Sequence, residues 1–300
     1  MNNTYLSIIV CTFNRSKILA LTLPYLSEQS RGFDSMEIIV IDNNSIDDTK
    51  DVIQEVQKKD PRIKYIHEIK QGLSFARNRG LEEASADWLL YLDDDAKLSQ
   101  NNLEHVFHTI ETYPFSMFTG VWKEWHLSTP PIWLPYSTGN YILKGSNTIR
   151  EIGDDYITGL IMLINKQKLL EIGGFPTNLG MKGNKVAYGE ETYVEQEFKK
   201  RGWKVGINPN IVIDHLVGEH KYKLSWHLEA AFAKGRDTQL IKRTIGRGGA
   251  KLGLLKSILF GWVKPLLKLI LRSEYYRQNF IIDYVGAIRY YQGVLVTFDE

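Results

Sequence analysis

The stretch WLLYLDDD, residues 88–95, is a short apolar run that ends in three consecutive acidic residues. An uncharged run of this length is typical of a strand buried on both faces of a parallel sheet. Adjacent carboxylates repel one another, and a fold tolerates them best beside a cation. Because ligands bind beyond the carboxyl ends of parallel strands, the stretch predicts a strand that carries a carboxylate cluster to a ligand site.

The chain before this stretch alternates between strand-like and helix-like segments. The predicted strands cover Ser7–Thr12, Glu37–Asp42, Ile63–His67 and Trp88–Leu92, and the predicted helices cover Ser16–Glu28, Asp47–Lys58 and Leu73–Ala84. This alternation predicts right-handed βαβ units and a mostly parallel central sheet flanked by helices, which is a Rossmann-like α/β fold. Thr12, Asn14, Asp42 and Asn44 then fall on the same edge of the sheet as the acidic triplet.

The second half of the chain is less regular. An apolar run covers Tyr156–Ile164, a helix pattern covers Glu190–Arg201, and an extended pattern covers Trp203–Ile213. From about residue 225 the pattern is mostly helical. We therefore predict one α/β domain over residues 1–224, with a first half of about 1–100 and a second half of about 101–224, followed by a helical extension over 225–300.

Composition excludes several classes of protein. The 300 residues are 43% hydrophobic, and 37 basic residues nearly balance 35 acidic ones, so the net charge of +2 does not favour nucleic acid as a partner. The single cysteine, Cys11, excludes a disulfide framework and a cysteine-based zinc cluster. The first residues lack the pattern of a signal peptide, and lysines interrupt the apolar stretch 252–271, so we expect a cytoplasmic protein.

The acidic triplet, Asp93, Asp94 and Asp95, has two interpretations. Carboxylates on an extended loop suit a hard divalent ion such as Mg²⁺ or Mn²⁺, which can in turn hold a diphosphate. The alternative is a solvated turn, where aspartate is common. The position after a buried strand favours the metal site.

Other polar residues also have a functional and a structural interpretation. Asp42 can accept a hydrogen bond from a base or a ribose, or it can belong to a turn that caps the next helix. Arg77 can donate to a base or a phosphate, or it can be an exposed helix arginine. Glu190 and Glu191 open a helix, where the macrodipole stabilises carboxylates. One of them could equally act as a general base.

Together these segments resemble the family 2 glycosyltransferases, which have a GT-A fold and use nucleotide sugars. The resemblance covers roughly residues 5–220. It rests on segments that follow the family's order, namely Ser7–Arg15, Glu37–Ser45, Ala76–Gly80, Leu92–Asp95, Gly173–Phe175 and Gly189–Glu191. It implies that residues 1–100 bind the nucleotide sugar and residues 101–224 bind the acceptor.

The resemblance also implies roles for single residues. The residues implied in nucleotide-sugar binding are Thr12, Asn14, Asp42, Asn44, Arg77, Asp93 and Asp94. Asp95 would ligate a Mn²⁺ or Mg²⁺ ion directly, with Asp93 and His215 in the metal shell. Glu191 would be the catalytic base and Glu190 an acceptor contact. The family's usual Gly-Glu-Asp is Gly-Glu-Glu here, so which glutamate is the base stays open.

The implied function is inverting, metal-assisted transfer of a sugar to the hydroxyl of a glycan or a lipid-linked glycan, as in cell-envelope polysaccharide biosynthesis. Two alternatives are a nucleotidyltransferase acting on sugar phosphates and an inactive sugar- or nucleotide-binding module. Nucleotidyltransferases usually carry an early glycine-rich loop, and Thr12–Lys17 contains no glycine. Trp122, Trp125 and Trp133 could stack on acceptor sugars or could pack in an ordinary core.

The extension contains an amphipathic segment at residues 252–272. Lys256, Lys264, Lys268 and Arg272 interrupt its leucines and isoleucines. Such a helix can lie on an anionic membrane, here the inner face of the cell membrane. The alternative is packing against its own domain or a second subunit, and the sequence leaves the oligomeric state open.

Overall fold

The computed structural model describes residues 5–134, 148–153, 157–183, 185–242 and 245–298. The chain divides into two compact units. Unit 1 comprises Met1–Lys123, Tyr141–Asn178 and Glu190–Leu216, and unit 2 comprises Glu124–Asn140, Leu179–Gly189 and Val217–Glu300. The functional division predicted at residue 224 stays a prediction.

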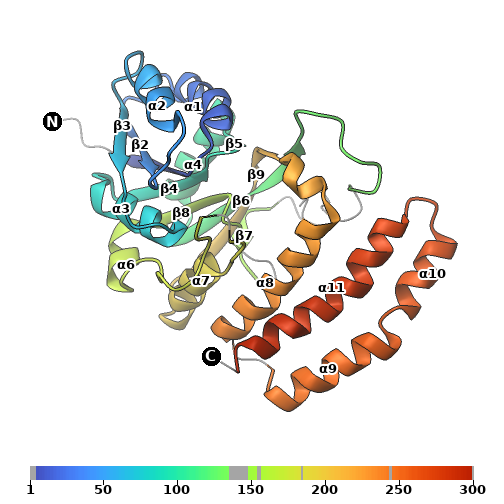
Figure 1. Ribbon diagram of the computed structural model, residues 1–300. Helices are drawn as coiled ribbons and strands as arrows, with labels where there is room; N and C mark the ends of the chain where they lie inside the picture. The colour runs from blue at the N-terminus through green and yellow to red at the C-terminus, as the bar shows by residue number, and fades with distance from the viewer. Residues whose placement is uncertain (1–4, 135–147, 154–156, 184, 243–244, 299–300) are drawn as a thin grey trace. The chain divides into compact units, whose positions relative to one another are not determined.

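Unit 1 is built on a nine-stranded sheet, counted over the described residues, in the order β3-β2-β1-β4-β8-β6-β9-β5, with β7 paired to β9 (Figure 1). The strands are β1 (Leu6–Thr12), β2 (Met36–Asp42), β3 (Ile63–His67), β4 (Trp88–Asp93), β5 (Ala96–Lys97), β6 (Met117–Trp125), β7 (Arg150–Glu151), β8 (Ile161–Asn165) and β9 (Val205–Leu216). Tyr156, where a predicted apolar run begins, lies outside the described residues.

The first four long strands form the parallel part of the sheet. β1 pairs in parallel with β2 and β4, and β2 pairs in parallel with β3, which confirms the predicted βαβ arrangement. Every residue of β2 is buried, as expected for a strand covered on both faces. The sheet then continues through β8, which pairs antiparallel with both β4 and β6. The sequence pattern did not reveal this antiparallel half.

Helices cover both faces of this sheet (Figure 1). Those of unit 1 are α1 (Ser16–Gln29), α2 (Thr49–Gln57), α3 (Leu73–Glu83), α4 (Gln100–Thr112), α6 (Lys166–Glu171) and α7 (Glu190–Lys200). Successive residues of β1 point to opposite faces, so Ile8 packs in the cluster with α1, α2 and α4, and Ile9 in the cluster with α3, α6 and α7.

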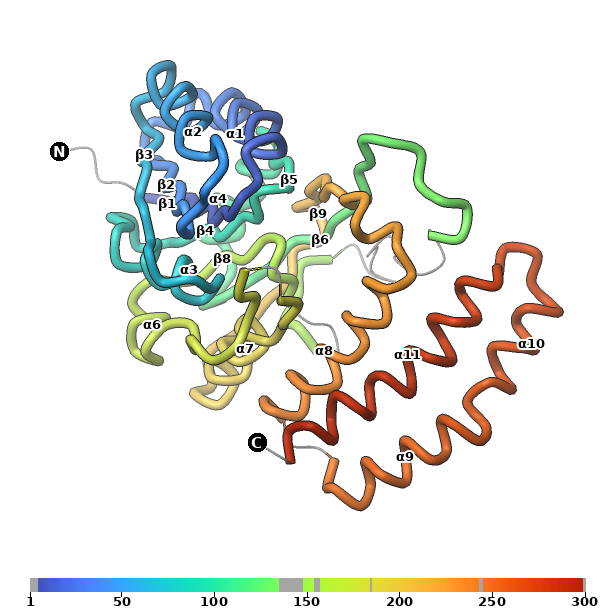
Figure 2. The backbone as a smooth tube through the Cα atoms, in the orientation of Figure 1, coloured from blue at the N-terminus to red at the C-terminus, as the bar shows by residue number. Residues whose placement is uncertain are grey.

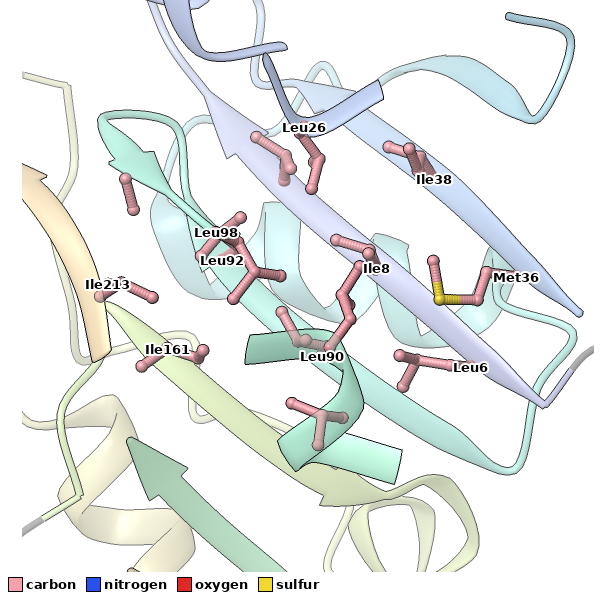
Figure 3. Packing of buried hydrophobic residues seen from close by; sticks show 14 of the residues in the cluster. Leu6, Ile8, Leu26, Met36, Ile38, Leu90, Leu92, Leu98, Ile161 and Ile213 are labelled. Atoms are coloured by element: carbon pink, nitrogen blue, oxygen red, sulfur yellow. The ribbon is translucent and has the colours of Figure 1, made fainter. Parts of the chain in front are cut away.

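The larger of these two apolar clusters, which contains Ile8, fixes the edge of the sheet at which the acidic triplet lies. Figure 3 shows Leu92 and Leu98, which flank the acidic triplet, in one apolar cluster with Ile161 and Ile213. Each fully buried aliphatic side chain of this kind contributes roughly 1.5–3 kcal/mol. The backbone on both sides of the triplet is therefore fixed by core packing.

Unit 2 is mainly helical. It contains a short 3₁₀ helix (Glu219–Tyr222) and α8 (Leu224–Lys242), α9 (Arg247–Phe260), α10 (Val263–Leu271) and α11 (Arg277–Val296). Figure 2 follows α9 into α10 and then back along α11. A Cβ atom on Gly293 would lie 2.0 Å from the carbonyl oxygen of Phe232, so α11 and α8 approach closely there. No helix in the described part of the chain is long and apolar enough to cross a bilayer.

Candidate active site

The carboxyl ends of the parallel strands meet at one edge of unit 1. The register pairs Thr12 at the end of β1 with Asp42 at the end of β2. On the other side of β1, Cys11 pairs with Asp93 at the end of β4. The predicted convergence of these polar residues is therefore confirmed, because three adjacent strands end within one residue of one another.

The ends of β1 and β2 are tied together by polar contacts. Asn14 and Asn44 both adopt left-handed backbone conformations, with φ of 52° and 66°. The Asn14 side chain accepts a hydrogen bond from the backbone amide of Ile46 at 2.8 Å. Asn44 itself is exposed. These contacts fix the two loops that border the site.

Asp42 is buried and held from two sides. Its Oδ1 accepts from the backbone amide of Ser45 at 2.9 Å, and its Oδ2 accepts from the hydroxyl of Tyr65 at 3.1 Å. The first contact is the turn predicted from the sequence. Tyr65 comes from β3, and no sequence signal pointed to it.

The three carboxylates of the triplet have different surroundings. The side chain of Asp93 is 33% exposed, whereas Asp94 and Asp95 are buried. Burial, opposed by Arg77 and reinforced by Asp95 and Asp94, raises the pKa of Asp93 to about 7. Burial also raises the pKa of Asp94, against the effect of Arg15. Crowding three carboxylates at one strand end is thus unfavourable without positive charge.

Thr12 and Arg15 provide the contacts to the inner pair of carboxylates. The Thr12 hydroxyl donates to Asp94 Oδ2 at 2.7 Å. Arg15 Nη1 lies 2.7 Å from Asp94 Oδ1 and 2.8 Å from Asp95 Oδ2. The sequence analysis assigned no role to Arg15. Its place three residues after Thr12, in the loop at the ligand edge, was the available signal.

His215 reaches the triplet through a strand pairing of only two residue pairs. β5 and β9 pair antiparallel, with Ala96 opposite His215. The His215 Nε2 atom lies 3.6 Å from Asp95 Oδ1, and the edge of Trp122 packs against the His215 ring. The structure therefore brings His215 to the predicted metal ligand Asp95.

Asp95 and His215 fit a divalent cation that also binds substrate oxygens. A carboxylate and an imidazole are suitable ligands for Mn²⁺, and such ions often take one or two protein ligands together with phosphates. Within the described residues, no group of three or more acidic, histidine or cysteine side chains is arranged to hold a metal alone. The metal roles of Asp93, Asp95 and His215 stay predictions.

Arg77 is buried rather than exposed, at 2%. Its Nη1 lies 2.7 Å from Glu190 Oε1, and its Nη2 lies 3.6 Å from Asp93 Oδ1. Burial opposes the charge on Arg77, but Glu190, Asp93 and Glu191 outweigh it and raise the pKa of Arg77. Arg77 thus connects the end of β4 with the start of α7.

Glu190 and Glu191, the first two residues of α7, differ in their contacts. Glu190 is buried, and its Oε2 has no hydrogen-bond partner among the described residues. Glu191 is only partly buried. Burial and the neighbouring Glu190, opposed by Arg77, raise the pKa of Glu191 to about 8. A carboxyl group with such a pKa can accept a proton near neutral pH.

The chain matches a known family over this same region. The model of glycosyl transferase family 2 matches residues 7–171, which is more than half of the chain. The chain belongs to glycosyl transferase family 2. This membership confirms the resemblance drawn from the motifs and identifies the protein as a glycosyltransferase.

Two curated relatives of this glycosyltransferase act on lipid-linked sugars, according to their names. It is 47% identical over 95 residues to the Campylobacter jejuni GalNAc(5)-diNAcBac-PP-undecaprenol beta-1,3-glucosyltransferase, a match that spans 31% of this chain and 30% of that enzyme. It is 22% identical over 272 residues to the Haloferax volcanii glucosyl-dolichyl phosphate glucuronosyltransferase, spanning 87% of this chain and 85% of the relative.

The fold is also found in solved structures. The mannosyltransferase PcManGT from Pyrobaculum calidifontis, in complex with GDP-Man and Mn²⁺, aligns with a TM-score of 0.68 and 16% identity. The alignment covers 98% of this chain and 88% of that one. At this identity the likeness concerns the fold, and it confirms that the glycosyltransferase has the predicted GT-A fold.

The three tryptophans proposed for acceptor binding have different settings in this glycosyltransferase. Trp122 contacts His215 in unit 1. Trp133 is buried in unit 2 in a cluster with Leu134 and Val217, and its carbonyl oxygen accepts from Asn279. Trp125 is partly buried. Ordinary packing therefore accounts for Trp133, and Trp122 is the one that contacts a predicted metal ligand.

Proposed function

We propose that this glycosyltransferase moves a sugar, with inversion, from a nucleoside diphosphate sugar to a hydroxyl group of a glycan or a lipid-linked glycan. The observation that carries the proposal is Glu191, whose raised pKa of about 8 suits a general base, beside the ion pair of Arg77 and Glu190. Family membership disfavours the nucleotidyltransferase alternative.

The contacts of the two glutamates favour Glu191 as the base. Glu190 is bound by the guanidinium of Arg77 at 2.7 Å, so its Oε1 is already engaged by a fixed partner. Its buried Oε2 remains able to accept a hydrogen bond from a substrate hydroxyl. We therefore assign proton transfer to Glu191 and acceptor positioning to Glu190.

The proposed reaction is a single displacement. Glu191 takes the proton of the acceptor hydroxyl while the hydroxyl oxygen bonds to the anomeric carbon. The bond between that carbon and the diphosphate oxygen breaks, and its electron pair leaves with the nucleoside diphosphate. Attack opposite the leaving group inverts the anomeric configuration.

The donor is proposed to lie along the edge formed by β1, β2 and β4. Thr12 and Asp42 are level with one another there, and Asp93 lies level with Cys11, one residue before Thr12, which supports the predicted contacts to base and ribose. Asp95 and His215 would hold a Mn²⁺ or Mg²⁺ ion, which supplies Lewis-acid stabilisation of the diphosphate when bound. The further nucleotide-sugar roles of Asn14, Asn44, Arg77 and Asp94 remain part of this proposal.

A donor panel tests this function. Thermal unfolding is measured with UDP-sugars and GDP-sugars, each with and without Mn²⁺, because a ligand that binds only the folded state raises the melting temperature. We expect at least one nucleotide sugar to stabilise the protein in a Mn²⁺-dependent way. The product formed from that donor should carry the anomeric configuration opposite to the donor's, as read from its proton coupling constants. Retention of configuration would contradict the mechanism.

The acceptor is proposed to be presented at a membrane surface, which is in keeping with the lipid-linked substrates named for the two relatives. Helices α9 and α10 expose a row of large apolar side chains. These are Leu252, Leu255, Ile258, Leu259, Phe260, Trp262, Val263, Leu267, Ile270 and Leu271, with Leu271 as much as 77% exposed. Single exposed apolar residues are ordinary, but a concentration of them on two consecutive helices favours an interaction site.

The charge of the same helices favours an anionic lipid surface. Between Asp237 and Glu274 the sequence contains no acidic residue, whereas α9, α10 and their junctions carry Arg247, Lys251, Lys256, Lys264, Lys268 and Arg272. Of these, Lys268 pairs with Asp283 of α11 at 2.6 Å. Basic residues beside an apolar face attract anionic headgroups, at about 1 kcal/mol for each residue near the surface. We therefore propose peripheral binding to anionic membranes through residues 252–272.

Vesicle co-sedimentation tests this part of the proposal. Wild-type protein should sediment with vesicles rich in phosphatidylglycerol and much less with phosphatidylcholine vesicles. Leu259→Glu should reduce binding, and Leu21→Glu, an equally exposed leucine in α1, should not. Equal sedimentation of the wild type and Leu259→Glu would count against this surface.

A further inference from the structure

One basic side chain lies where the acidic triplet is expected to meet its cation. Arg15, in the loop between β1 and α1, places a single nitrogen within 2.8 Å of both Asp94 and Asp95. The carboxylates of Asp94 and Asp95 directly follow β4, and the guanidinium of Arg15 comes from the loop that follows β1. Arg15 therefore provides one positive charge, from within the chain, to the two carboxylates.

The two oxygens of Asp95 face different partners. Oδ2 contacts Arg15 Nη1 at 2.8 Å, and Oδ1 lies 3.6 Å from His215 Nε2. A divalent cation held by Asp95 and His215 would share this carboxylate with the guanidinium. Two positive groups on one buried carboxylate repel each other, and the surrounding protein screens that repulsion less than water does.

We propose that Arg15 competes electrostatically with the divalent cation at Asp95, so that the cation binds tightly only together with the diphosphate of the donor. This inference rests on the proposed nucleotide and metal site. It adds that tight binding of the cation depends on the presence of the diphosphate. A diphosphate brings the negative charge that lets the guanidinium and the metal remain close together. The side chain of Arg15 is 32% exposed, so an arriving phosphate can reach it.

Linkage makes the proposal measurable. If the diphosphate raises the affinity for the metal, the metal raises the affinity for the diphosphate by the same factor. Arg15 increases this coupling because it weakens metal binding only while the diphosphate is absent. Removal of the Arg15 charge should therefore strengthen the binding of metal alone and reduce the coupling.

Electron paramagnetic resonance of free Mn²⁺ measures this binding without any turnover. Full-length wild-type protein and Arg15→Gln are titrated with Mn²⁺ alone, then with Mn²⁺ in the presence of UDP or of GDP. We expect Arg15→Gln to bind Mn²⁺ alone about tenfold more tightly than the wild type, within the usual range of coupling between sites. We also expect the nucleotide to increase its Mn²⁺ affinity by a correspondingly smaller factor.

Two further variants separate the contact from general charge and from folding. Arg15→Lys keeps the positive charge and should retain the weak metal binding of the wild type. Lys17→Gln removes an exposed charge from the same part of the chain and should leave Mn²⁺ affinity unchanged. Circular dichroism checks that each variant is folded.

The outcomes distinguish this inference from the proposed function. Unchanged or weaker binding of Mn²⁺ alone by folded Arg15→Gln, with normal binding by the wild type in the presence of nucleotide, overturns the role of Arg15 and leaves the metal site standing. Absence of Mn²⁺ binding by the wild type, even with either nucleotide, overturns the metal site and this inference with it.

Discussion

Arg77 and Glu190 form a buried ion pair, with Nη1 of the arginine 2.7 Å from Oε1 of the glutamate. The pair joins α3 to the first residue of α7. It places a fixed positive charge beside Glu191, whose pKa is raised by burial and by the neighbouring Glu190. The proposed division of labour between the two glutamates rests on the contact of Arg77 with Glu190.

Loss of the Arg77 charge should destabilise unit 1 strongly. Arg77→Met leaves Glu190 buried without its partner, and breaking a buried pair in this way costs about 3–5 kcal/mol. The matched control is Arg79→Met, because Arg79 pairs with Glu83 on the same helix but with a side chain that is 37% exposed. That change should cost no more than about 1 kcal/mol. Urea unfolding, followed by circular dichroism, measures the free energy of unfolding of both variants. Similar losses in Arg77→Met and Arg79→Met would contradict the role assigned to burial.

The reaction rate should follow the ionisation of Glu191. A general base works when deprotonated, so kcat/KM should rise about tenfold per pH unit below about 8 and level off above it. Glu191→Gln should lower turnover by roughly 10²–10⁴-fold while donor binding persists. Glu197→Gln serves as the control, because Glu197 lies on the same helix and pairs there with Lys200 and Arg201. A flat pH profile between 6 and 9 would argue against Glu191 as the base.

Stability should depend on pH through the same residue. The pKa of Glu191 is about 8 in the folded protein and 4.5 in its ordinary state, so between these values the folded state holds a proton that the unfolded state has released. The contribution of Glu191 to the free energy of unfolding therefore falls as pH rises from about 4.5 to 8. Glu191→Gln should be increasingly stable relative to the wild type across this window. Melting temperatures at pH 5, 7 and 9 measure the difference, which should not be constant.

Two glycines of α11 should respond in opposite ways to alanine. A Cβ atom at Gly293 would lie 2.0 Å from the Phe232 carbonyl oxygen, so Gly293→Ala must separate α11 from α8, at a cost of roughly 1–3 kcal/mol. A Cβ atom at Gly286 meets only the Ala231 side chain, at 3.7 Å. Gly286→Ala should therefore gain up to about 1 kcal/mol from helix propensity. Thermal unfolding of the two variants provides the comparison.

The parallel half of the fold could be predicted because its signals are local. β1 and β2 are runs of β-branched residues of strand length, and the burial of β2 along its whole length matches that pattern. The polar residues that end the strands could also be placed together, because parallel strands end at a common edge.

The antiparallel half and the partners of charged residues could not be predicted in the same way. β5 has only two residues, and its pairing with β9 depends on a contact between distant parts of the chain. Nothing in the sequence around Arg77 specifies Glu190 as its partner. The triplet likewise consists of three identical side chains, and only the tertiary structure separates Asp93, one third exposed, from the buried Asp94 and Asp95.

The pairing of Ala96 with His215 also bears on the timing of biosynthesis. Domains form as the chain emerges from the ribosome, N-terminal segments first, at about 5–20 residues per second. Asp95 is made early, with the parallel strands, whereas β9 is among the last strands of unit 1 to emerge. A nascent or prematurely terminated chain that lacks β9 would therefore carry the acidic turn without the imidazole, and the proposed Mn²⁺ site would be complete only once this unit is fully translated.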